Sequence, residues 1–267
     1  MNITKQHQYQ LDTEGYIVLP NIVPRALCSD VVKLIMSFTG ADLKKPDSWY
    51  KKDLGHNGIV PIHQHQAVWN IRQYTSIHQA FAKLLATEKL WVRLDRLSFK
   101  PPQRRSEAFD KSNIHLDFPY QKITSLRLQG ILYLTDTEEN QGAFCCVPEL
   151  FKQPEVLKQK ENLWFSDKEL EGYEIKNVAA TAGSLIIWDS RLPHSGNINT
   201  SDQPRLAQYL SMCPEDSEES RASRIALWQA KRAPEKWRNM PYQQDPEDGD
   251  VATLTELGQK LLGLTRW

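Results

Sequence analysis

The chain has 267 residues, 40% of them hydrophobic and 9% aromatic, which predicts one globular domain with a substantial core. Thirty-three basic and thirty-three acidic residues cancel, so the chain lacks the positive field that draws proteins to nucleic acid or anionic membranes. Residues 1–15 contain no apolar run of signal-peptide kind, and no segment approaches the roughly 18 apolar residues of a membrane helix. We therefore expect a soluble cytoplasmic protein with a small-molecule substrate and no nucleic-acid or membrane partner. The oligomeric state stays open.

Helical patterns occupy the first part of the chain, about residues 1–88. The stretch 23–40 (VPRALCSDVVKLIMSFTG) has Pro24 near a helix start, an apolar stripe and Gly40 as a stop, and it predicts a helix. Residues 41–66 show too little periodicity for an assignment. A second helix is predicted at about residues 76–86.

Short alternating segments indicate strands in the middle part, about residues 89–214. In residues 90–100 (LWVRLDRLSFK) the alternation predicts one strand with five side chains on a shared face: Val92, Leu94, Arg96, Ser98 and Lys100. Residues 125–136 (SLRLQGILYLTD) place leucines on one face and a mixed set on the other, as expected of a strand lining a polar cavity: Arg127, Gln129, Ile131 and Tyr133.

Four further strands are predicted in GAFCCVP (142–148), YEIKNVAA (173–180), GSLIIW (183–188) and RLAQYLSM (205–212). The last part, about residues 215–267, becomes helical again in SEESRASRIALWQAKRAP and in TLTELGQKLLGL, where Thr253 and Glu256 suggest a capping box. The whole chain, 1–267, therefore predicts a single mainly β domain with flanking helices, built as a sandwich or jelly-roll barrel.

The stretch SNIHLDFPYQ, residues 112–121, contains a candidate metal site. His115 and Asp117 would point the same way from an extended segment, although a lone His-x-Asp pair is weak evidence. His194 follows the GSLIIW strand and a short turn, and could supply a third ligand from another part of the sheet. Two histidines and one carboxylate on one face of a ferrous ion leave three positions for a bidentate organic acid and dioxygen.

Arg205 follows His194 by eleven residues and begins the segment RLAQYLSM. A guanidinium near the metal could hold the far carboxylate of 2-oxoglutarate through two parallel hydrogen bonds. The ordinary alternative for an arginine is a salt bridge at the surface.

This set of residues resembles the phytanoyl-CoA dioxygenase family of Fe(II)- and 2-oxoglutarate-dependent oxygenases. The similarity continues in GYIVLPNIV (15–23), KPP (100–102), LYLTDTEENQGAFCCVPE (132–149) and AGSLIIWDSRLPHSGN (182–197). It implies a double-stranded β-helix of cupin type, with iron on His115, Asp117 and His194 and 2-oxoglutarate on Arg205. It also implies hydroxylation of an unactivated C–H bond of a small organic molecule by O2, with release of succinate and CO2.

Other residues are candidates for contacts in the same pocket. Gln129 and Ser195 are expected near the cosubstrate, although Ser195–Gly196 reverses the Gly-Ser order common in the family. Substrate contacts are expected from six side chains, for which solvated strand charges or ordinary core packing are the alternatives: Arg96, Ser98, Lys100, Tyr133, Trp69 and Arg72.

Two other classes of function compete with the oxygenase. A zinc-dependent hydrolase could use the same three ligands to activate water, and a catalytically silent barrel could bind a ligand without chemistry. His63 and His65 form an alternative histidine pair, but no third ligand or arginine accompanies them. The sequence does not identify the substrate, and desaturation, ring closure and epoxidation would use the same residues as hydroxylation.

Overall fold

The computed structural model describes residues 3–55, 57–104 and 113–267. The α-helices in these ranges are α1 (Lys5–Glu14), α2 (Arg25–Thr39), α3 (Gln66–Arg72), α4 (Thr75–Leu84), α5 (Pro148–Phe151), α6 (Pro154–Lys158), α7 (Glu218–Gln229) and α8 (Glu256–Leu262). Short 3-10 helices are η1 (Pro46–Tyr50), η2 (Tyr120–Lys122) and η3 (Glu235–Trp237). The strands are β1 (Tyr16–Leu19), β2 (Ile59–Val60), β3 (Leu90–Val92), β4 (Leu97–Lys100), β5 (Leu128–Tyr133), β6 (Phe144–Cys146), β7 (Lys176–Val178), β8 (Leu185–Asp189), β9 (His194–Gly196), β10 (Arg205–Tyr209) and β11 (Met212–Pro214).

Two antiparallel sheets form the centre of the described structure. The larger sheet has the strand order β1-β8-β5-β10-β4-β2, and the smaller one has the order β7-β6-β9. His115 extends the smaller sheet through a bridge to His194. Side chains from both sheets share one buried cluster, so the sheets pack face to face, and within the described residues they do not close into a continuous barrel. The predicted mainly β architecture with flanking helices is therefore confirmed.

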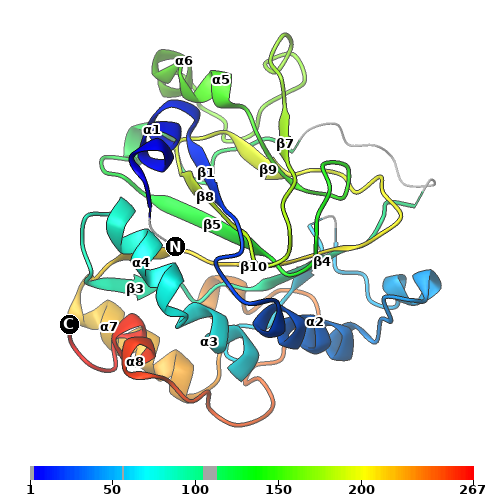
Figure 1. The fold of residues 1–267 in the computed structure, drawn as a ribbon, viewed down its shortest axis with the longest axis vertical. Coiled ribbons are helices and arrows are strands. Elements are labelled where there is room, and N and C mark those ends of the chain that lie inside the picture. Colours follow the sequence, from blue (N-terminus) through cyan, green and yellow to red (C-terminus); the bar gives the residue numbers. More distant parts are fainter. Residues whose placement is uncertain (1–2, 56, 105–112) are drawn as a thin grey trace.

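The alternation in β5 and β8 explains how the larger sheet is covered on both faces. Leu132 and Leu185 point to a large core that includes buried residues of α2, α3 and α4, and these helices lie along one side of the sheet (Figure 1). Tyr133 and Ile186, their neighbours in sequence, point to the cluster between the two sheets. Because successive side chains of a strand face opposite ways, one short segment contributes to both cores.

The predicted helices at 23–40 and 76–86 correspond to α2 and α4, and Gly40 ends α2 with a left-handed φ of 69°. Besides the short helices α5 and α6, which were not predicted, two helices of the N-terminal part had no clear sequence signal. The first, α1, is polar, and Leu11 is its one buried residue; the second, α3, follows the unassigned stretch and begins after His65. The N-terminal part is also not purely helical, because β1 pairs with β8 at the edge of the large sheet.

Three predicted boundaries are wrong. Residues 205–212 do not form one strand, because β10 ends at Tyr209 in the large sheet and β11 begins at Met212 and pairs with β3. Residues 90–100 do not form one strand: β3 pairs with β11 in a separate two-stranded sheet, whereas β4 pairs with β10 in the large one. The chain bends between them, where the N–H of Asp95 donates to the carbonyl of Arg93 at 2.9 Å. In α8 the cap is Thr255, whose hydroxyl accepts from the N–H of Gly258, and not a box formed by Thr253 and Glu256.

Across the described ranges, no helix combines the length and the apolar character required to cross a lipid bilayer.

Candidate metal and cosubstrate site

Backbone pairing brings the three predicted metal ligands together. His194 begins β9, and its N–H and carbonyl exchange hydrogen bonds of 3.0 Å with the backbone of His115. Asp117 lies two residues after His115, where the side chain of an extended chain again points to the same face. The Nε2 atom of His115 lies 3.5 Å from Asp117 Oδ1, and Nε2 of His194 lies 3.7 Å from Oδ2. One ligand atom from each residue falls within 4.8 Å of the others, which is close enough for one metal ion.

The two imidazole rings are oriented by local hydrogen bonds. Nδ1 of His115 is 2.8 Å from the carbonyl of Asn113, and Nδ1 of His194 is 2.8 Å from the carbonyl of Leu192. A carbonyl oxygen can only accept, so in each ring Nδ1 carries the proton and donates it. The Nε2 lone pairs are then directed to the space beside Asp117, as a metal ligand requires.

The charge of this group suits a cation. Burial by itself would raise the pKa of Asp117, but the neighbouring imidazoles of His115 and His194 and a hydrogen bond from Gln129 hold that pKa below its usual range. Burial lowers the pKa of His194 to about 4, against the opposing effect of Asp117. At neutral pH the aspartate is therefore ionised and His194 is neutral, so both offer lone pairs to a metal ion.

Arg205 begins β10, directly opposite Lys100 of β4, and is 1% exposed. No hydrogen bond or ion pair joins its side chain to another described residue, and its Nε is buried without a partner. The alternative of a surface salt bridge is therefore excluded. Lys100 Nζ donates to the carbonyl of Gly196 at 3.0 Å, and burial together with the charge of Arg205 lowers its pKa to about 7. A buried guanidinium and a buried amine that is about half protonated at neutral pH thus lie beside the strand that carries His194.

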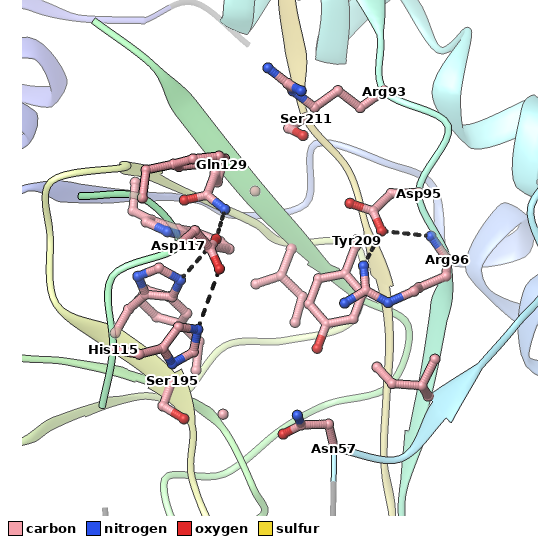
Figure 2. Close-up of a pocket in the computed structure, with 18 of the residues that line it drawn as sticks. Asn57, Arg93, Asp95, Arg96, His115, Asp117, Gln129, Ser195, Tyr209 and Ser211 are labelled. Atoms are coloured by element: carbon pink, nitrogen blue, oxygen red, sulfur yellow. Dashed lines mark hydrogen bonds and ion pairs between the residues drawn. The ribbon is translucent and has the colours of Figure 1, made fainter. Parts of the chain in front are cut away.

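The three ligands and Arg205 line one cavity of about 330 Å³. Figure 2 shows His115 and Asp117 on one side of it and Arg96, Asp95 and Tyr209 on the opposite side. Arg96 is paired with Asp95 at 2.5 Å, and its guanidinium also lies over the rings of two aromatic residues, Tyr209 and Trp237.

Several predicted pocket residues occupy the expected place. Gln129, Ser195 and Arg96 line the cavity. Gln129 was expected to contact the cosubstrate. It instead donates to Asp117 Oδ2 and so contacts a metal ligand. Lys100 is not part of the lining itself and reaches it through the Gly196 carbonyl.

Contrary to expectation, four residues do not line this cavity: Ser98, Tyr133, Trp69 and Arg72. All four are fully buried. The Ser98 hydroxyl donates to the Asn57 carbonyl, and Tyr133 bonds the smaller sheet through Phe144 and Val178. Trp69 Nε1 donates to a glutamine side-chain oxygen in the helical core, and Arg72 donates to the backbone carbonyls of His63 and Asp95. Most of their polar groups are satisfied by the fold, although Nε of Arg72 is buried without a partner. Polar character alone therefore did not place these residues in the cavity.

Arg127 and Ile131, on the mixed face expected to line a polar cavity, do line it. Further lining residues were not predicted, among them Arg93, Asp95, Phe118, Tyr209, Lys236 and Trp237. Arg93 lies at the unexpected bend between β3 and β4, and Lys236 and Trp237 come from η3 in the C-terminal part. No sequence pattern around these residues indicates that they line a cavity. His63 and His65 belong to no potential metal cluster of the described chain.

Fold and site together define a jelly-roll protein with a two-histidine, one-carboxylate metal site beside a buried arginine. Residues 11–207 match the family Phytanoyl-CoA dioxygenase (PhyH), and the chain belongs to this family. A protein of Dictyostelium discoideum named "Putative phytanoyl-CoA dioxygenase" is 25% identical over 256 residues, covering 75% of this chain and 72% of the relative. The Ava biosynthesis cluster protein O of Aspergillus versicolor is 26% identical over 235 residues, covering 75% of each chain.

Solved structures have the same fold at low sequence identity. The "Putative Oxidoreductase" of Salmonella typhimurium LT2 has a TM-score of 0.71 and 16% identity, covering 98% of this chain and 83% of its own. HygX of Streptomyces hygroscopicus, with nickel and 2-oxoglutarate bound, has a TM-score of 0.55 at 13% identity and coverages of 80% and 88%. The epimerase SnoN from nogalamycin biosynthesis, in complex with Fe3+, alpha ketoglutarate and nogalamycin RO, has a TM-score of 0.56 at 13% identity and coverages of 95% and 96%. These likenesses confirm the predicted cupin-like jelly roll.

Proposed function

We propose that the protein is an Fe(II)- and 2-oxoglutarate-dependent oxygenase that hydroxylates an unactivated C–H bond of a small organic molecule. One observation carries the proposal: a buried arginine without a partner lines the same cavity as a two-histidine, one-carboxylate triad. An uncompensated buried guanidinium is unfavourable unless an anion completes it. Membership of the dioxygenase family and the 2-oxoglutarate bound to HygX on the same fold give further support.

The donor set fits a ferrous ion. His115, His194 and Asp117 would hold it on one face, and the remaining positions would face the cavity. When bound, iron and 2-oxoglutarate supply the oxidising chemistry, in which one O2 converts 2-oxoglutarate to succinate and CO2 and a C–H bond to an alcohol. The residues of the chain fix the ligand orientation, bind the cosubstrate and exclude water from the site.

Arg205 would bind the distal carboxylate of 2-oxoglutarate. Its fork of donors matches a carboxylate, and Lys100 adds a second positive group next to it. Gly196 lies beside both groups: a Cβ atom there would lie at ordinary contact distance, 3.6 Å from a terminal nitrogen of Arg205 and 3.9 Å from Lys100 Nζ. Burial of both cations strengthens their attraction for the anion.

The zinc hydrolase and the silent barrel explain the triad but give no role to Arg205. A hydrolase needs a metal-bound water and no carboxylate clamp. The type of oxidation has to be established separately from the oxygenase class, since SnoN is an epimerase on this fold. Product analysis with 18O2 would distinguish hydroxylation from other oxidative outcomes, because an alcohol formed by hydroxylation carries the label.

The first test is an anaerobic titration with Fe(II) and then 2-oxoglutarate, followed by the weak visible absorption of the iron chelate. We expect the band in the wild-type protein, its loss in His115→Ala and its retention in His65→Ala. His65 is the matched control because it is exposed and belongs to no potential metal cluster of the described chain. Metal binding without a band in folded wild-type protein would contradict the proposal and favour the zinc hydrolase.

A further inference from the structure

Three cationic side chains of the cavity have no role in binding the metal or the cosubstrate: Arg93, Arg127 and Lys236. They come from separate parts of the chain. Arg93 follows β3, Arg127 directly precedes β5, and Lys236 lies in η3. Their convergence is therefore a property of the fold and not of one charged segment.

The cavity contains too few carboxylates to neutralise these cations. The aspartates in its lining are Asp95, which is paired with Arg96 at 2.5 Å, and Asp117, which is a metal ligand. No hydrogen bond or ion pair joins the side chains of Arg93, Arg127 or Lys236 to another residue within the described parts of the chain. Arg127 and Lys236 lie over the aromatic rings of Phe118 and Trp237, which leaves their charges, like that of Arg93, without a carboxylate partner in the described chain.

The cations also lie close enough to repel one another. Burial lowers the pKa of Arg127, and the charge of Arg93 lowers it further. Burial likewise lowers the pKa of Lys236, with Asp95 opposing and with Arg93 and Arg96 adding to the effect. Neighbouring like charges in a partly desolvated cavity are unfavourable unless an anion is bound between them.

The position of Arg127 connects this group to the reaction site. Its guanidinium lies 3.7 Å from the centre of the Phe118 ring, and Phe118 directly follows the metal ligand Asp117. An anion on Arg127 would therefore be bound beside the segment that carries the metal. Arg205 and Lys100 lie elsewhere, next to Gly196, so a second anion can bind without displacing the cosubstrate.

We infer that the substrate is a small organic anion whose carboxylate, phosphate or sulfate group is bound by Arg93 and Arg127, with Lys236 contributing to the positive field. This inference rests on the proposed function, because it assigns the substrate class of that same site. Arg93 and Arg127 also line an adjoining hollow of about 280 Å³, together with polar residues such as Lys122 and Thr124 and apolar residues such as Leu126. The same two arginines thus line both cavities.

The test uses three probes with one aromatic ring, chosen because Phe118 and Trp237 line the cavity. Phenylacetate and phenyl phosphate are anions, and phenylacetamide is their neutral counterpart. Each is titrated anaerobically into protein saturated with Fe(II) and 2-oxoglutarate, and the shift of the visible band reports binding. Saturating 2-oxoglutarate keeps Arg205 occupied, so the probes report on the second site alone.

We expect at least one anionic probe to bind about tenfold or more tightly than phenylacetamide. Arg93→Gln and Arg127→Gln should each remove most of this preference and leave the starting band unchanged, whereas Arg127→Lys should retain part of it. Arg25→Gln is the control, because Arg25 is an exposed arginine outside the lining. The preference between phenylacetate and phenyl phosphate separates a carboxylate substrate from a phosphorylated one.

Failure of this inference differs from failure of the proposed function. No starting band would remove the oxygenase assignment itself. A normal band with anionic probes that bind no better than the amide would overturn the anionic substrate, and so would an unchanged preference in both glutamine variants.

Discussion

Gln129 shows how much a single residue can contribute without being a metal ligand. Its amide donates to Asp117 Oδ2, so Asp117 is held by a neutral partner that leaves its negative charge intact. Outer groups of this kind fix the direction of a ligand, and their loss commonly reduces metal affinity by about 10–100-fold. Gln129 is thus a positioning residue for the metal.

The substitution Gln129→Ala is expected to weaken Fe(II) binding by about tenfold or more. Competition with a metal-sensitive dye under anaerobic conditions would measure the dissociation constant, and far-UV circular dichroism would check the fold. Gln159→Ala, at an exposed position outside the lining, should bind iron as the wild type does. Equal affinity in Gln129→Ala would show that the hydrogen bond does not orient Asp117.

Arg205 can be tested by a substitution that keeps the charge. In Arg205→Lys one ammonium group replaces a planar fork, so the dissociation constant for 2-oxoglutarate should rise about tenfold or more while Fe(II) affinity is maintained. Titration of the visible chelate band measures both quantities. A lysine variant with wild-type affinity for 2-oxoglutarate would place the cosubstrate carboxylate elsewhere, most directly at Lys100.

At the scale of elements, β5 connects the two sheets through one side chain. Tyr133 OH accepts from the N–H of Phe144 at 2.8 Å and donates to the carbonyl of Val178 at 2.9 Å, which joins β5 to β6 and β7. Burial raises the pKa of this phenol above its usual range, so it stays neutral and can donate. The phenol is therefore part of the frame that holds the smaller sheet, and with it β9 and His194.

Tyr133→Phe should lower the free energy of unfolding by about 1–3 kcal/mol, because two buried backbone groups lose their partner. Urea denaturation of the variant and of Tyr9→Phe, a change at an exposed tyrosine, provides the comparison. The affinity for probes in the cavity should not change in Tyr133→Phe. A loss of probe binding with unchanged stability would return Tyr133 to the substrate pocket.

At the scale of the whole molecule, the C-terminal part packs back onto the helical side and contributes to the cavity. The Glu247 carboxylate accepts from the backbone N–H groups of His63 and Gln64, at 2.6 and 2.9 Å, and η3 supplies Lys236 and Trp237 to the lining. His63 is completely buried beneath this contact. Burial, aided by Arg72, lowers the pKa of His63 to about 4.

This histidine should make the stability of the protein depend on pH. The folded state keeps His63 neutral down to about pH 4, whereas in the unfolded chain it gains a proton near pH 6.5. Below pH 6.5 the unfolded state therefore binds the proton of His63 more readily, and this residue by itself should lower the free energy of unfolding by about 3 kcal/mol as the pH decreases to 4. Glu247, whose pKa burial raises to about 7, contributes in the opposite direction, so the His63 contribution is obtained as the difference between wild type and variant. Urea denaturation across this range, with a chelator present, should show less loss of stability at low pH for His63→Gln than for the wild type. Parallel curves would mean that the folded protein accommodates the protonated ring.

The sequence by itself determined the features that depend on neighbouring residues. Alternation identified β5, a short apolar segment identified β8, an apolar stripe with a stop at Gly40 identified α2, and the order His115, Asp117, His194 and Arg205 indicated the candidate site. These signals are local, because side-chain direction in a strand or helix follows from its repeat. The likeness to a family then joined the separate signals into one expected arrangement.

Only the tertiary structure decided which polar residues meet at the cavity. Ser98 and Tyr133 have the alternation of lining residues but are bonded into the sheets, whereas Arg93 reaches the cavity because the chain bends between β3 and β4. Lys236 arrives from a C-terminal segment more than a hundred residues after Asp117. Contacts of this kind depend on how distant elements pack together. No short stretch of sequence carries a repeat that predicts such packing.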